Sequence, residues 1–140
     1  MKISRLITRL ETTRDEIKFA FQRGIRGYSD RDLWDIDCWF MDIFPKMLQQ
    51  FRKTSYRHPH SLTYIEWQKT LDKMTYLLLE ANSFNEYPKM SKTHRMLRIR
   101  QIDPVHKKYE NGEINGWEYC ETQKNRFMKL FTQYFFDLWE

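Results

Sequence analysis

Apolar side chains recur at intervals of three and four residues along most of this chain, which is the spacing of one face of an α-helix. The pattern predicts four main helices, over residues 2–23, 29–53 and 63–82 and from Asn115 onward. Shorter helices are predicted over 89–101 and 103–110. No linker or repeat interrupts this pattern, so we expect an all-α fold, a compact helical bundle forming a single domain over residues 1–140.

Polar residues mark where several of these helices begin. A Ser, Thr or Asn followed three residues later by an acid is typical of a capping box, in which two side chains bind the free amides of the first turn. The pairs are Ser29 and Asp32, Thr63 and Glu66, and Asn115 and Glu118. Asp103 followed by Pro104 predicts an N-cap and a first helical residue.

The predicted helix over 29–53 carries the clearest apolar stripe, which stays in phase across Pro45 and so predicts a kink rather than a stop. The stripe consists of Leu33, Ile36, Phe40, Ile43, Phe44, Met47 and Phe51. Asp37 projects onto the same face, and a buried carboxylate must be paired or protonated. We therefore predict that Asp37 is a structural buried acid bonded to Arg14, Arg26 or Tyr28 rather than a catalytic group.

Charge and cysteine content narrow the class of protein. The net charge is +5 and the pI about 9.2, which favours anionic partners or serves only solubility. Cys38 and Cys120 are too few for a disulfide framework, so a reduced, cytoplasmic setting is expected. No run of about 18 apolar residues is present, so no membrane association is expected.

Three segments resemble a group of small, mostly uncharacterised proteins encoded by tailed bacteriophages. They are RGYSDRDLWDIDCWFMDIFPKML over 26–48, LTYIEWQKTLDKM over 62–74, and LFTQYFFDLWE over 130–140, about a third of the chain. The resemblance implies a phage origin and the cytoplasm of an infected bacterium. It transfers no catalytic residue. Small phage proteins of this kind are often accessory or counter-defence factors.

A basic segment is the strongest candidate for ligand binding. Its predicted phosphate-binding residues are Lys92, Arg95, Arg98, Arg100, Lys107 and Lys108. The guanidinium group of Arg can donate two parallel hydrogen bonds to one phosphate. Aromatic rings on either side of the basic segment can stack on nucleobases. The predicted stacking rings are Tyr87, Tyr109 and Trp117. A solvated helix face and a protein-docking surface are the other interpretations of the same residues.

The remaining chemistry points away from catalysis. The chain contains no P-loop, GxGxxG or GxSxG motif. His58, His60, His94 and His106 lack metal-ligand spacing, so no metal or other cofactor is expected. The surplus of aromatic residues indicates a wide core, self-association into a homo-oligomer, or a ring-lined pocket.

These patterns lead to one functional expectation and two alternatives. We expect a non-enzymatic binding protein that counters bacterial defence by sequestering a phosphate-bearing nucleotide signal. The alternatives are an inhibitor that binds an acidic surface of a host defence enzyme and an accessory factor that binds nucleic acid.

Overall fold

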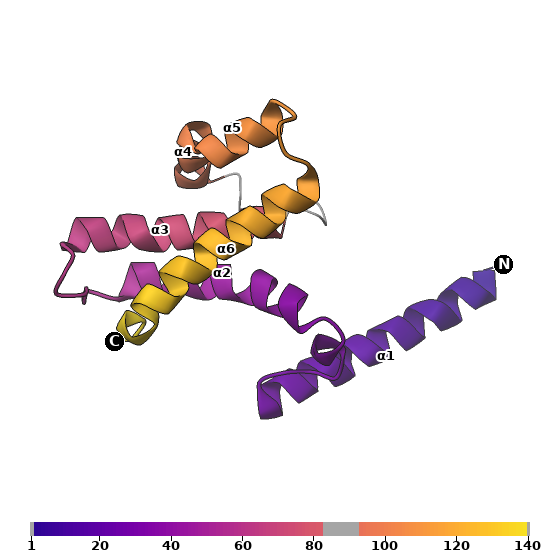
Figure 1. The fold of residues 1–140 in the computed structure, drawn as a ribbon. Helices are drawn as coiled ribbons and strands as arrows, with labels where there is room; N and C mark the ends of the chain where they lie inside the picture. The colour runs from indigo at the N-terminus through magenta and orange to yellow at the C-terminus, as the bar shows by residue number, and fades with distance from the viewer. Residues whose placement is uncertain (1, 83–92, 140) are drawn as a thin grey trace. The chain divides into compact units, whose positions relative to one another are not determined.

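The protein is helical throughout its described length. The computed structural model describes residues 2–82 and 93–139, with side chains from residue 7 onward, and contains no strand among them. The elements in chain order are α1 (Lys2–Arg26), the 3₁₀ turn η1 (Arg31–Leu33), α2 (Ile36–Thr54), α3 (Tyr64–Ala81), α4 (His94–Ile102), α5 (Pro104–Glu110), α6 (Gly116–Tyr134) and the 3₁₀ turn η4 (Phe135–Asp137) (Figure 1). The prediction of an all-α fold is confirmed.

The chain forms two compact units. Unit 1 is Met1–Trp39 and unit 2 is Phe40–Glu140. Helix α2 begins in unit 1 and continues as the first helix of unit 2.

Unit 1 consists of α1 and the turn that follows it. The helix runs three residues beyond its predicted end, and Gly27 then adopts a φ of +79°, a left-handed conformation that favours glycine at a helix end. Ser29 and Asp32 exchange hydrogen bonds as the capping pattern predicts, with the Ser29 amide donating to Asp32 Oδ2 over 2.7 Å. The pair closes the 3₁₀ turn η1, so α2 begins at Ile36 instead of Ser29.

Unit 2 is built around α3, which packs against α4 and α6. The last two turns of α3 are buried on every side, since residues 74–81 are all buried. Rings from α2 and α6 complete the core: Phe40 stacks on Phe44 at 4.8 Å between ring centroids, and Phe44 meets Phe131 edge-on at 5.3 Å. Leu48 is buried where the predicted stripe had Met47, which is exposed.

The predicted helix starts of unit 2 are confirmed. Thr63 and Glu66 form a capping box at α3, and Asn115 and Glu118 form one at α6. Asp103 accepts a hydrogen bond from the Val105 amide over 3.1 Å, with Pro104 at the first position of α5. Of the helix predicted over 89–101, residues 89–92 lie outside the described part, and α4 begins at His94 after its N-cap Thr93.

Candidate functional site: a basic cleft in unit 2

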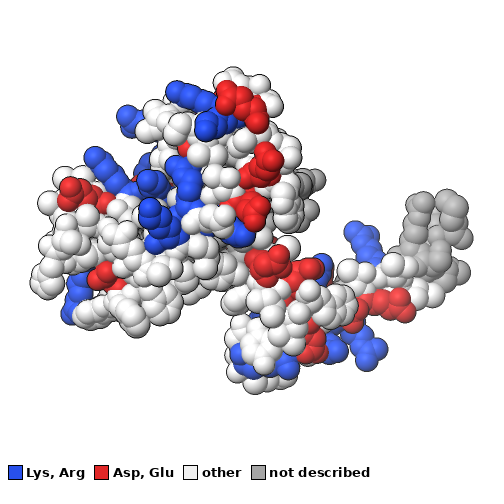
Figure 2. Space-filling view, viewed as in Figure 1, with Lys and Arg blue, Asp and Glu red and all other residues white. Residues whose placement is uncertain are grey.

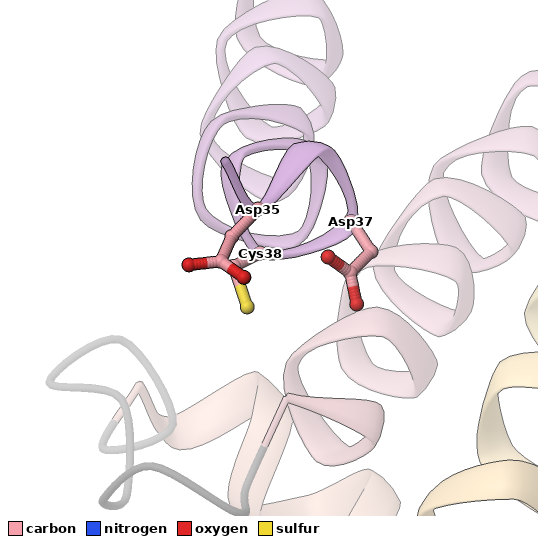
Figure 3. Close-up of side chains that lie close together, drawn as sticks. All are labelled: Asp35, Asp37 and Cys38. Carbon is pink, nitrogen blue, oxygen red and sulfur yellow. The ribbon is translucent and has the colours of Figure 1, made fainter. Parts of the chain in front are cut away.

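The prediction that Asp37 is buried is wrong. Its side chain is exposed in the first turn of α2, beside Asp35 and Cys38 (Figure 3). Asp37 is in phase with buried Leu48, but it lies one turn before the packed part of the helix begins at Phe40. A carboxylate in a first helical turn is stabilised by the helix dipole, so it needs no buried partner.

The predicted partners of Asp37 are also exposed. Arg14 lies on the surface of α1, and Arg26 pairs with Asp30 while donating to the Tyr28 carbonyl over 3.1 Å. Unit 1 instead buries Asp32, which accepts a hydrogen bond from Arg23 Nε over 2.9 Å. This bond lowers the pKa of Asp32 below its ordinary value, although burial opposes the shift.

Exposed Asp35 and Asp37 and half-buried Cys38 bring one ligand-type atom of each residue within 4.8 Å of the others. It is the only such group of His, Cys, Asp or Glu within residues 7–82 and 93–139. No histidine belongs to it. Helix-start electrostatics account for both carboxylates, so the group is not evidence for a metal.

Unit 2 holds a buried acid at the junction of α4 and α5 that the sequence identified only as a helix cap. Asp103 Oδ2 accepts hydrogen bonds of 2.8 Å from the Tyr76 hydroxyl and from Gln123 Nε2. Arg126 Nη1 donates to Asp103 Oδ1 over 2.9 Å. Burial by itself would raise the pKa of Asp103, but the donors and the Arg126 charge outweigh it and lower the pKa.

Glu80 is a second buried acid of unit 2. Its carboxylate accepts hydrogen bonds from Arg100 Nε over 2.8 Å and from the Tyr119 hydroxyl over 2.7 Å. Burial raises the pKa of the phenols of both Tyr119 and Tyr76, and their carboxylate acceptors add to the shift. These groups tie α3 to α4 and α6 and keep the phenols protonated.

An open cleft of about 580 Å³ adjoins this network, and Tyr76, Asp103 and Arg126 belong to both. It is formed by α3, α4, the start of α5 and α6. Its lining consists of Lys69, Asp72, Lys73, Tyr76, Arg95, Arg98, Ile99, Ile102, Asp103, Pro104 and Arg126. We call it the basic cleft, because five of these side chains are cationic and two are acidic. Lys and Arg gather on the face of unit 2 over α3, α4 and α6 (Figure 2).

Both acids of the basic cleft are already paired. Asp72 lies 2.9 Å from Arg52 and 3.3 Å from Arg95, and Asp103 holds Arg126. By contrast, Lys69, Lys73 and Arg98 form no ion pair with any acid in the described part of the chain. Lys73 and Arg98 therefore face the cleft without a neutralising carboxylate among the described residues, and Lys69 adds a further positive charge, although it also acts on the Glu66 carboxylate. This excess of positive charge makes the cleft suited to an anion.

The structure separates the predicted phosphate-binding residues. Arg95 and Arg98 line the basic cleft. Arg100 is committed to Glu80, and Lys107 and Lys108 are exposed on α5 away from the cleft lining. Lys92 lies outside the described residues.

The sequence missed the cations that other helices contribute to the basic cleft. Lys69 and Lys73 lie one turn apart on α3, and Arg126 comes from α6. The spacing of Lys69 and Lys73 was visible in the sequence, but nothing in it indicated that α4 packs beside that turn.

None of the predicted stacking rings within the described residues lines the basic cleft. Tyr109 stacks on Tyr119 with 4.7 Å between ring centroids, and Trp117 is exposed at the start of α6. Tyr87 lies outside the described residues. Ile99, Ile102 and Pro104 instead form an apolar wall of the cleft.

A second cleft of about 410 Å³ lies between the loop after α2 and the C-terminal segment. His58 and His60 line it together with Tyr56, Arg57, Asp137 and Trp139. The Arg57 guanidinium lies 4.7 Å from the centre of the Trp139 ring. Both histidines are exposed.

The described lining of the basic cleft contains no Ser, Cys or His, and both of its carboxylates are held by arginines. The arrangement offers fixed positive charge beside an apolar wall.

Comparison of the chain with protein-family models, curated proteins and solved structures finds no match. Among the described helices, none has the length and apolar character needed to cross a bilayer.

Proposed function

We propose that unit 2 binds a phosphate-bearing nucleotide in the basic cleft and releases it unchanged. The observation that carries this proposal is the placement of Lys69, Lys73 and Arg98 around one cleft whose acids are already paired. A phosphate group would gain charge-assisted hydrogen bonds from these side chains without displacing an existing ion pair.

The apolar wall supports a nucleotide over a simple anion. Ile99, Ile102 and Pro104 stand on the same cleft as the cations, and Ile102 is mostly exposed. A nucleobase placed against them would bury apolar surface, which contributes roughly 25 cal/mol per Å².

The biological setting of the proposal rests on the resemblance to proteins of tailed bacteriophages. A phage protein that binds a nucleotide messenger without cleaving it would counter bacterial defence by sequestration. The bacterial cytoplasm during infection is the setting that this role requires.

The test is calorimetric titration of the full chain with cyclic dinucleotides and ADP-ribose derivatives. We expect binding to at least one of these probes, and intact probe recovered after the protein is denatured by heat. Failure of every probe to bind, or recovery of a cleaved probe, would contradict the proposal.

Matched variants locate the site. Lys73→Ala and Arg98→Ala each remove a charge-assisted hydrogen bond worth about 1.5–3 kcal/mol, so each should weaken binding by about 10-fold or more. Lys108→Ala removes the same charge from an exposed position outside the cleft lining and should leave affinity unchanged. Equal effects of all three variants would mean that net charge, not the cleft, attracts the ligand.

Exposed rings favour the protein-directed inhibitor as the second candidate function. Phe136 and Tyr56 are each 85% exposed, and Trp139 is 58% exposed. Aromatic residues are enriched at protein interfaces. If a host protein co-purifies with the parent chain but not with Phe136→Ser, and no nucleotide binds, this candidate would be favoured.

Binding to nucleic acid that weakens steeply as the salt concentration rises would favour the accessory factor.

A further inference from the structure

Helix α1 carries a long apolar stripe that nothing else in unit 1 covers. Ile7, Leu10, Ile17 and Phe21 are 52%, 69%, 65% and 68% exposed. The turn that follows α1 is bonded to the last turns of this helix, through Gln22, Arg23 and Arg26. Amphipathic helices gain most of their stability by burying such a face, so this one calls for a partner surface.

The stripe has the spacing of a coiled-coil seam. Positions 7, 10, 14, 17 and 21 alternate steps of three and four residues, the a and d positions of a heptad repeat. Four of the five are apolar, and the central one is Arg14. A single charged residue at the centre of such a seam restricts the register and the orientation in which two helices can pair.

The charge pattern excludes a parallel, in-register pair. Such a pair would bring Arg14 of one copy against Arg14 of the other inside the seam. Like charges facing each other in a packed interface are destabilising.

We propose that α1 pairs antiparallel with α1 of a second copy of this chain, with the twofold axis near Thr12. In this register Ile7 of one copy faces Ile17 of the other, and Leu10 faces the methylene stem of Arg14. The guanidinium of Arg14 then lies beside Glu11 of the second copy, so the twofold symmetry forms two ion pairs.

The residues that flank the seam fit the same register. Thr13 of one copy lies next to Thr13 of the other, and the small side chain of Ala20 lets the helices approach closely near Phe21. The helix is about 37 Å long at 1.5 Å per residue, which accommodates every layer from Ile7 to Ile17.

Sedimentation equilibrium of the full chain tests the pairing. We expect a mass of twice 17.5 kDa, falling to that of one chain for Leu10→Glu. Thr12→Glu places the same charge on the opposite face of α1 and should leave the dimer intact. A single-chain mass for the parent protein, or a dimer that survives Leu10→Glu, would overturn the proposal.

Disulfide trapping tests the orientation, in a background where Cys38 is replaced by Ala. A sample carrying Ile7→Cys mixed with one carrying Ile17→Cys should form a covalent mixed dimer on oxidation, because these positions face each other only in the antiparallel pair. Covalent dimers within each sample alone would instead indicate a parallel pair and overturn the proposal. Nucleotide titration of Leu10→Glu keeps this test separate from that of the basic cleft, since no residue of α1 lines it.

Discussion

At the scale of single residues, burial separates two arginines of α4. An arginine in a buried ion pair stabilises the fold, whereas an exposed arginine without an acidic partner can bind a ligand. Arg100 is 17% exposed and lies 2.6 Å from the buried carboxylate of Glu80, so its charge is needed inside unit 2. Arg98 is exposed at the basic cleft and pairs with no described acid. Removing one member of a buried pair leaves an uncompensated charge, whereas removing an exposed charge does not.

This difference predicts opposite behaviour for two neighbouring substitutions. Arg100→Ala should lower the free energy of unfolding by about 3–5 kcal/mol, because Glu80 is left buried without its cation. Arg98→Ala should change it by less than about 0.5 kcal/mol. Urea denaturation followed by circular dichroism measures both. Similar losses from the two variants would contradict the assignment of Arg100 to the fold.

At the scale of elements, helix limits follow from hydrogen bonds between residues close in sequence. Thr63 and Asn115 start α3 and α6 through reciprocal bonds with an acid three residues on. The same chemistry at Ser29 closes a 3₁₀ turn, because Asp32 is also held by Arg23 of α1. Helix α2 continues through Pro45, consistent with the prediction that this residue does not end it.

The capping box of α3 should make a measurable contribution to the free energy of unfolding. Thr63→Ala removes the acceptor for the Glu66 amide and should lower the free energy of unfolding by about 1 kcal/mol. The control is Thr70→Ala in the same helix, where the hydroxyl donates only to the Glu66 carbonyl within the helix. Alanine is the better helix former there, so the control should be neutral or slightly stabilising. Equal losses at both positions would rule out a specific capping effect.

At the scale of the whole molecule, each unit contains a buried carboxylate that is held ionised. Hydrogen bonding to Arg23 lowers the pKa of Asp32 in unit 1. In unit 2 the pKa of Asp103 is lowered despite the opposing effect of its burial. Because both values lie below the value of about 3.9 for an unfolded chain, the unfolded state binds more protons in acid.

Stability should therefore be fully present above about pH 5 and decline as the pH falls below about 4 toward the lowered pKa values. Urea denaturation at a series of pH values measures this dependence. Asp103→Asn should be less stable than the parent at neutral pH and lose less on acidification, because it no longer takes up a proton on unfolding. An identical slope in the two proteins would show that Asp103 does not contribute.

Part of the candidate site could be predicted from the sequence, because Arg95 and Arg98 lie within one basic run. Arg100 belongs to the same run, and only the packing of α4 against α3 shows that Glu80 takes it. Likewise, only the packing of α5 against α6 shows that Tyr109 stacks on Tyr119, outside the lining of the basic cleft. Nothing in the local pattern distinguishes these residues from exposed ones.

The amino-acid sequence by itself determined the all-helical class, the starts of α3, α5 and α6, and the apolar stripe of α1. Those features depend on side chains within about four residues of each other, where helix periodicity and capping geometry act. Only the tertiary structure decided that Asp103 is a buried acid while Asp37 is exposed, and that Lys73, Arg98 and Arg126 share one cleft. Burial and charge pairing depend on which helices meet in space, and Tyr76 reaches Asp103 across 27 positions of the chain.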